Sequence, residues 1–274
     1  MKLLFFIGIA GIILFEILNV FFIMPMPGSQ RINSIELAYF LYTHRWFFRL
    51  GFLLFIVAGA YQTYLSNKWL FFVPLALNLA VIFAFNFVMA ADAMFYQPQS
   101  LQIVDSSSNQ IPLDRLIIGV NIGGEAKAYP ISLIGYHHQV RDRIGNKEIM
   151  VTYCTVCRTG RVFEPKVGGK LENFRLVGMD HFNAMFEDQT TKSWWRQANG
   201  EAIMGPLKGT LLPELPAQQM SLAMWLKLYP KSKIMQPDPA FKEEYDSTGK
   251  SPILWFMDFK SLLLMKLLLK MQLN

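Results

Sequence analysis

The sequence has little cysteine and little charge. Its 274 residues include only two cysteines, Cys154 and Cys157, which are too few for a disulfide framework. Charged residues make up 17% of the chain and hydrophobic residues 53%, an apolar balance for a soluble protein. The 26 basic residues exceed the 20 acidic ones by six and form no basic block, which argues against nucleic-acid binding. No motif indicates a nucleotide cofactor, and none identifies a protein partner.

Apolar sequence is concentrated in the first ninety residues. Residues 3–24, 46–66 and 69–90 are each long enough to cross a bilayer, which takes roughly 20 apolar residues. A cleaved signal peptide is the alternative for the first segment, but bulky residues 22–25 offer no small-residue cleavage site. We therefore expect three transmembrane helices within residues 1–92, with Glu16 packed against a neighbouring helix, and the lipid bilayer as a partner.

The orientation of these helices is weakly specified. The basic residues flanking the segments divide almost evenly between the two sides, so the positive-inside rule does not decide. After the third segment no Lys or Arg occurs until Arg115, and a linker without basic residues is easier to translocate. This favours an extracytoplasmic soluble domain.

The remaining sequence predicts an α+β protein whose soluble domain is rich in strands. After a polar linker, residues 93–112, strand patterns recur near 116–121, 126–129, 139–143, 148–153, 161–165 and 171–177, with turn signals between them. Helical spacing occurs at 220–229 and ends at Pro230. We expect a β-rich domain with short helices over residues 113–237. In the tail, residues 238–274, leucines alternate with lysines, which fits either an interfacial amphipathic helix or an altered C-terminus.

The two cysteines mark the expected site. They follow a β-type run, residues 149–153, and precede a second one, so they lie at the tip of a strand–turn–strand. Two thiolates at this spacing can face one metal ion, but a closed zinc site needs four ligands. We favour a site of Cys154, Cys157 and His137, with His181 as the fourth ligand. Thiolate and imidazole ligands suit zinc or copper.

Three other interpretations of the cysteines stay open. They could form a redox pair, with Arg158 and Arg161 lowering a thiol pKa, although the thioredoxin βαβ pattern is absent. One cysteine could be a nucleophile, with His137 as base and Asp180 or Asn183 orienting it. Alternatively both are core residues, because cysteine is among the most often buried residue types.

Other polar residues are expected near this site or in a pocket of their own. Adjacent residues of a strand point to opposite faces, so His138 would point away from a site that contains His137. Trp194, Arg196 and Gln197 form a polar and aromatic group that could line a pocket. The alternative, which we favour, is that one tryptophan of the pair at 194–195 is core and its neighbour is partly exposed.

An ordered series of motifs adds a family resemblance. The motifs are Gly119-Val120-Asn121, Gly124-Glu125-Ala126-Lys127-Ala128-Tyr129-Pro130, Tyr136-His137, Val151-Thr152-Tyr153-Cys154-Thr155-Val156-Cys157, Ser193-Trp194, Gln197, and Gly200-Glu201-Ala202-Ile203-Met204-Gly205-Pro206-Leu207. Together they resemble the bacterial and archaeal family called domain of unknown function 3179, over roughly residues 113–237.

The resemblance implies a membrane-anchored member in a bacterial cytoplasmic membrane, with an extracytoplasmic domain. It groups His137, Cys154 and Cys157 in one site and supplies no biochemical activity. The family's Trp-His is Tyr136-His137 here, and its Gly after the second cysteine is Arg158. That position often needs a positive φ, which glycine adopts most readily.

Overall fold

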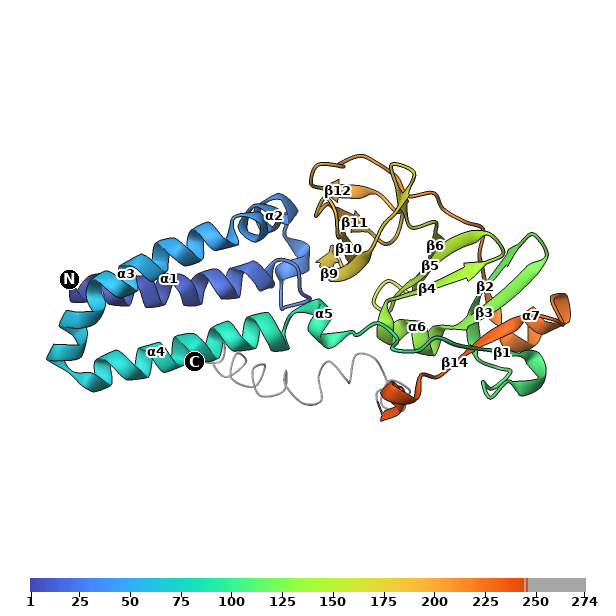
Figure 1. Ribbon diagram of the computed structural model, residues 1–274, viewed down its shortest axis with the longest axis horizontal. Coiled ribbons are helices and arrows are strands. Elements are labelled where there is room, and N and C mark those ends of the chain that lie inside the picture. Colours follow the sequence, from blue (N-terminus) through green and yellow to red (C-terminus); the bar gives the residue numbers. More distant parts are fainter. Residues whose placement is uncertain (244, 246–274) are drawn as a thin grey trace. The chain divides into compact units, whose positions relative to one another are not determined.

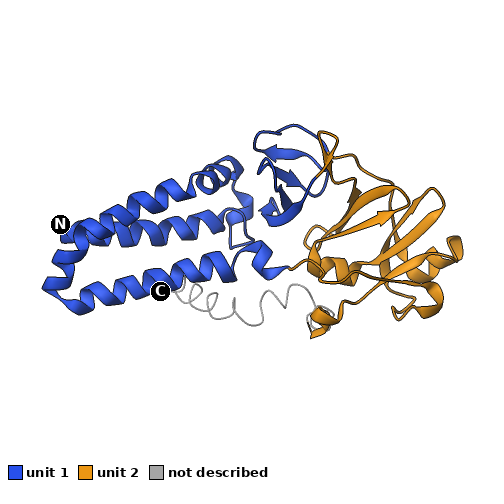
Figure 2. Ribbon diagram, in the orientation of Figure 1, with its two compact units in different colours: residues 1–95, 172–211 blue, residues 96–171, 212–274 orange. Residues whose placement is uncertain are grey.

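The chain forms two compact units (Figure 2). The computed structural model describes residues 1–243 and residue 245. Unit 1 joins residues 1–95 to residues 172–211, and unit 2 joins residues 96–171 to the described residues from 212 onward. The second part of unit 1 comes from within the predicted β-rich domain, so the division into units does not follow the order of the sequence.

Three long helices dominate unit 1 (Figure 1). They are α1 (Lys2–Phe21), α3 (Arg45–Ser66) and α4 (Lys68–Phe83), and α4 continues as a π-helical turn, η2 (Ala84–Val88). All three are long and apolar enough to cross a membrane, as the sequence predicts. Asn67 separates the second from the third, because its side chain accepts a hydrogen bond from the Trp69 amide at 2.8 Å and caps α4.

Small and polar residues join these helices. A Cβ added to Gly59 of α3 would lie 2.4 Å from the Phe5 nitrogen of α1, so glycine permits the close approach of the two helices. Glu16 is buried and accepts hydrogen bonds from Arg49 at 2.7 and 2.9 Å and from Asn86 at 2.8 Å. The expected packing of Glu16 against neighbouring helices is therefore confirmed.

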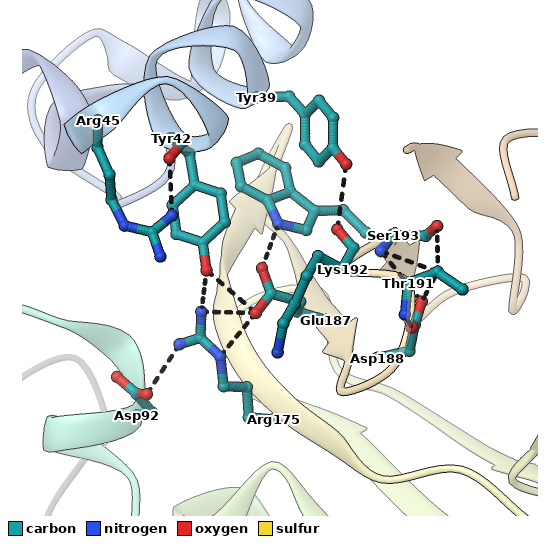
Figure 3. A network of polar contacts seen from close by, with 11 residues as sticks. Tyr39, Tyr42, Arg45, Asp92, Arg175, Glu187, Asp188, Thr191, Lys192 and Ser193 are labelled. Atoms are coloured by element: carbon teal, nitrogen blue, oxygen red, sulfur yellow. Dashed lines mark hydrogen bonds and ion pairs between the residues drawn. The ribbon is translucent and has the colours of Figure 1, made fainter. Parts of the chain in front are cut away.

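Unit 1 also contains an antiparallel sheet of four strands in the order β12-β11-β10-β9. Its strands are β9 (Phe174–Asp180), β10 (Asn183–Asp188), β11 (Trp194–Arg196) and β12 (Ala202–Met204), and the short helices of the unit are η1 (Ser29–Arg31), α2 (Ile35–Thr43) and α5 (Ala91–Met94). Polar contacts tie α2 and α5 to the sheet (Figure 3). Arg175 of β9 bonds Asp92 of α5 at 2.8 Å and the Tyr42 hydroxyl of α2 at 2.6 Å.

Unit 2 contains the other strands. A five-stranded sheet has the order β1-β14-β3-β2-β13, a three-stranded antiparallel sheet has the order β4-β5-β6, and β7 pairs with β8. The bounds are β1 (Gln102–Asp105), β2 (Leu116–Ile122), β3 (Glu125–Pro130), β4 (Gln139–Ile144), β5 (Lys147–Cys154), β6 (Thr159–Phe163), β7 (Lys166–Val167), β8 (Lys170–Leu171), β13 (Gln218–Ser221) and β14 (Lys233–Gln236), with helices η3 (Ser106–Ser108), α6 (Ile131–His137), α7 (Leu222–Leu228) and η4 (Pro239–Phe241).

One hydrophobic core serves both larger sheets of unit 2. It includes Ile118 of β2, Val151 of β5 and Trp225 of α7, all essentially inaccessible. Gly119 is required for this packing, because a Cβ there would lie 2.5 Å from the Trp225 ring. The α+β class and the β-rich domain with short helices are thereby confirmed. The predicted linker contributes strand β1, and most of the predicted tail lies outside the described residues.

Candidate functional site

The two cysteines lie at the tip of the β5–β6 hairpin in unit 2. Cys154 ends β5 and pairs with Thr159, the first residue of β6, and residues 155–158 form the turn between them. The Cys154 side chain is fully buried and Cys157 is exposed. This is the strand–turn–strand that the sequence predicts, and it presents one thiol to solvent and one to the protein interior.

Arg158 gives this turn its shape. Its φ is +51°, the left-handed region that glycine adopts without strain and that other L-residues seldom occupy. The family resemblance predicts this conformation from the usual glycine at the position, and the structure confirms it for arginine. The turn after the second cysteine is therefore kept although the glycine is absent.

The pKa of Tyr153 is influenced by the charged groups around the tip of the β5–β6 hairpin. Burial raises the pKa of its phenol, the positive charge of Arg158 opposes that rise, and Cys154 and Cys157 add to it. All three neighbours therefore lie close enough to the Tyr153 hydroxyl to influence it. The charges of Arg158, Cys154 and Cys157 therefore all act on the Tyr153 phenol. Arg161, the other arginine predicted near the pair, forms an ion pair with Glu214 at 3.0 Å.

His137 is held on both sides of its ring. It ends α6 and is fully buried, and its Nδ1 lies 2.5 Å from the carbonyl oxygen of Tyr96. Because a carbonyl oxygen only accepts, Nδ1 carries the proton. Burial lowers the His137 pKa, so the ring is neutral and Nε2 accepts the hydrogen bond from the Tyr245 hydroxyl at 2.5 Å. A metal ion could bind Nε2 only by displacing Tyr245.

His138 connects α6 to the strand of the cysteines. It follows the last residue of α6 in a left-handed conformation with φ +61°, and its carbonyl oxygen accepts a hydrogen bond from the Tyr153 amide at 3.0 Å. Burial lowers its pKa to about 4. The expectation that His137 and His138 point to opposite faces of a strand does not apply, since the first of them is helical.

Most of the other candidate residues form a second polar cluster, in unit 1. Asp180 is buried at the end of β9 and accepts hydrogen bonds from Arg196 at 2.5 and 3.0 Å, while His181 Nδ1 lies 2.6 Å from its other oxygen. Asn183 accepts from the Ala198 amide at 3.0 Å, and its side-chain amide points to Gln197 at 3.4 Å.

The cluster sits at a tight turn between two strands. His181 and Phe182 join β9 to β10 with φ values of +48° and +64°, as a two-residue hairpin turn with both central residues left-handed requires. Asp180 orients the ring of His181 through Nδ1, and the His181 side chain is 53% exposed. Trp194 and Trp195 are both core, so the expectation that one of them is partly exposed is wrong, and Trp194 donates its Nε1–H to Glu187 at 3.1 Å.

The predicted metal ligands are divided between the units. Cys154, Cys157 and His137 lie in unit 2, and His181 lies in unit 1. Among residues 1–243 and 245, no group of three or more His, Cys, Asp or Glu side chains is placed to hold a metal ion. The four-ligand set therefore stays a prediction, and the geometry in unit 2 offers a pair of thiols.

Sequence reasoning missed the tyrosines of this region. Tyr153 directly precedes the first cysteine, so its place in the motif indicates that it lies near the thiols. Tyr96 and Tyr245 contact His137 from 41 and 108 residues away, and no local pattern indicates either contact.

Comparison with known proteins supports the resemblance. The model of a family described as "Protein of unknown function (DUF3179)" matches residues 96–257, which is more than half of the chain. No curated protein and no solved structure matched. The matched region includes the β5–β6 hairpin of unit 2 and the β9–β12 sheet of unit 1. The chain therefore belongs to the DUF3179 family.

Proposed function

We propose that this protein is a membrane-anchored thiol protein that exchanges disulfides through Cys154 and Cys157. The observation that carries the proposal is the unequal exposure of two thiols on one tight turn, with Cys154 buried and Cys157 exposed. In thiol–disulfide exchange one thiol must be accessible to the partner's disulfide. The other must lie close to the first thiol so that it can resolve the mixed disulfide. Arg158 favours the thiolate that this chemistry needs.

The exchange balances in two steps. The Cys157 thiolate attacks one sulfur of a partner's disulfide, which forms a mixed disulfide and releases the first partner thiolate. The Cys154 thiolate then attacks the Cys157 sulfur, which forms the Cys154–Cys157 disulfide and releases the second. The partner gains two electrons, and the two thiol protons pass to its sulfurs. Residues three apart across a tight turn have Cα atoms within about 7 Å, and a disulfide spans roughly 4.4–6.8 Å.

The three apolar helices of unit 1 support anchoring in a bacterial cytoplasmic membrane, with the hairpin on the extracytoplasmic side. Disulfides form and persist in oxidising compartments outside the cytoplasm, so this side suits exchange chemistry. The linker that lacks basic residues before Arg115 supports the same orientation.

Metal binding by the same pair is the second candidate, and the left-handed Arg158 favours it. That conformation keeps the turn after the second cysteine tight, as a metal knuckle requires. Two thiolates suit a soft ion that accepts few ligands, so monovalent copper fits the pair better than zinc, which takes four. His137 would become a ligand through Nε2 only if Tyr245 left that nitrogen, whereas His181 could keep its Nδ1 contact with Asp180 while its Nε2 bound an ion.

Trapping and metal analysis of the full-length protein in detergent separate these functions. Oxidised glutathione is the probe disulfide. The Cys154→Ser variant should retain glutathione on Cys157, wild type should release it as its own disulfide closes, and Cys157→Ser should react least. Thr155→Ser is the matched control in the turn and should behave as wild type.

Mass spectrometry of the adducts and metal content of the same samples give the readout. Wild-type protein that retains stoichiometric copper after purification, and that does not react with glutathione disulfide, would replace exchange by metal binding. Wild-type protein that neither reacts with glutathione disulfide nor retains copper would contradict both proposals.

A further inference from the structure

Helix α2 packs one of its faces on the sheet of unit 1. The Tyr39 ring lies edge-on to Trp194 with ring centroids 5.0 Å apart, and the Tyr42 ring lies 5.3 Å from the same tryptophan. The Tyr39 hydroxyl donates to the Lys192 carbonyl at 3.2 Å, and the Tyr42 hydroxyl bonds the buried Glu187 at 3.1 Å (Figure 3). These contacts fix the helix to β10 and β11.

The opposite side of α2 is exposed and carries two large apolar residues, with the charged Glu36 at its edge in an ion pair with Lys208. Leu37 and Phe40, three residues apart and therefore on one face of the helix, are 48% and 49% exposed. Ile32, just before the helix, is 50% exposed. A contiguous set of exposed large apolar side chains marks an interaction surface.

This surface continues onto an exposed part of α3. Phe40 contacts His44 with ring centroids 4.4 Å apart and meets Phe48 of α3 edge-on at 6.1 Å. Phe48 in turn contacts Phe47, which is 75% exposed. Since α3 is one of the three helices able to cross a membrane, an unbroken apolar and aromatic strip runs from it to α2.

We propose that α2 lies in the interfacial layer of the bilayer, with Leu37 and Phe40 at the boundary of headgroups and acyl chains, and that its tyrosines hold the β9–β12 sheet at the membrane surface. The inference rests on the membrane anchoring in the proposed function and adds a surface to it. The partner is lipid rather than protein because the face is continuous with the predicted spans.

The dimensions and chemistry of α2 suit this location. Its nine residues are too few to span a bilayer, and it leads into α3 after one residue, His44. Exposed Leu37 and Phe40 on one side of a helix that is held to the protein by its other side can be buried at the boundary of headgroups and acyl chains. Aromatic side chains favour this layer, and Arg31 beside the helix is exposed where lipid phosphates would lie.

Nitroxide accessibility measured on the full chain in phosphatidylcholine–phosphatidylglycerol nanodiscs tests the inference. Single cysteines replace Leu37 or Phe40 in a Cys154→Ser/Cys157→Ser background. Leu53→Cys on exposed α3 is the reference for lipid, and Thr190→Cys in an exposed turn of unit 1 is the reference for water. Labels at 37 and 40 should collide with oxygen several-fold more, and with a water-soluble nickel chelate several-fold less, than the label at 190.

Two results would overturn the inference. Nickel accessibility at 37 and 40 equal to that at 190 would place α2 in water. Dipolar broadening between labels at 37 would instead show that a second copy of the chain covers the face. If the label at 53 were also open to nickel, membrane anchoring itself would fail, whereas disulfide exchange is measured separately.

Discussion

At the scale of single residues, Arg158 combines two opposing effects. Its left-handed backbone costs roughly 1–2 kcal/mol relative to the right-handed region, and its guanidinium favours the neighbouring thiolates. We expect Arg158→Gly to raise the free energy of unfolding by about 1 kcal/mol, because glycine adopts positive φ readily. The same change should slow alkylation of Cys157 at neutral pH, because it removes the cation that follows this thiol in the chain.

Urea denaturation and the pH dependence of iodoacetamide reaction measure these two effects separately. Arg161→Gln is the matched control, because Arg161 forms a solvent-exposed ion pair with Glu214 and should change neither quantity appreciably. An Arg158→Gly protein that is more stable but alkylates with an unchanged pH profile would show that Arg158 does not act on the thiols.

His138 should make stability depend on pH. Burial lowers its pKa to about 4, while the unfolded chain has the usual value of about 6.5. As pH falls below about 6.5 the unfolded state takes up the proton first, so the free energy of unfolding falls, and the decline levels off below about 4. The full loss from this residue is about 3 kcal/mol, and the lowered pKa of His137 acts in the same direction.

The urea midpoint measured from pH 7.5 to 4 should show this decline. In His138→Asn, whose side chain tolerates the left-handed conformation, the slope should be shallower. Equal slopes in the variant and the wild type would assign the acid sensitivity to other groups.

At the scale of elements, local signals predicted the hairpins well. The turns at Gly123-Gly124 and Gly145-Asn146 separate apolar runs by short distances, and the strands on either side pair as expected. The parallel pairing of β14 with β3 places Lys233 opposite Lys127. The pairing of β1 with β14 joins residues that are even further apart in the sequence. Such pairings depend on the whole core, so patterns along the sequence do not contain them.

The helix bundle depends on the buried charge of Glu16. Its carboxylate accepts three hydrogen bonds from Arg49 and Asn86, and α1, α3 and η2 each contribute one of these residues. We expect Glu16→Ala to lower the free energy of unfolding by roughly 3–5 kcal/mol, because Arg49 then loses its counter-charge in a poorly solvated place.

Loss of helical circular dichroism with temperature in detergent measures this effect. Glu36→Ala is the control: its ion pair with Lys208 is solvent-exposed, so its removal should cost about 0.5 kcal/mol or less. Similar melting of both variants would mean that the Glu16 network contributes little to the bundle.

At the scale of the whole molecule, the matched family region does not fold as one body. Residues 172–211 lie within the DUF3179 match, yet they pack with the N-terminal helices through Tyr42–Glu187 and Asp92–Arg175. The two residues of each pair are 145 and 83 positions apart in the sequence, so no local pattern indicates these contacts. The sequence therefore assigns the strands of residues 172–211 to the β-rich domain by composition alone. For the same reason the sequence groups His181 with the cysteines in one domain, and the structure assigns it to unit 1.

The two units also separate two kinds of chemistry. The thiols of Cys154 and Cys157 belong to unit 2, and the Asp180–His181 pair belongs to unit 1 together with the apolar helices. Both thiols that the proposed disulfide exchange uses therefore belong to unit 2. We expect His181→Ala to leave the reaction of the protein with oxidised glutathione unchanged, as measured by the rate of adduct formation. A several-fold slower reaction would instead connect the His181 cluster to the thiols.

A redox titration of the full-length protein tests the proposed function most directly. The protein is equilibrated in mixtures of reduced and oxidised dithiothreitol, and the thiols that remain are counted by mass after maleimide labelling. Exchange by Cys154 and Cys157 predicts that both thiols disappear together at a single potential and return on reduction, with neither variant, Cys154→Ser or Cys157→Ser, showing the transition. Two thiols that remain open to maleimide in every mixture would contradict the proposal.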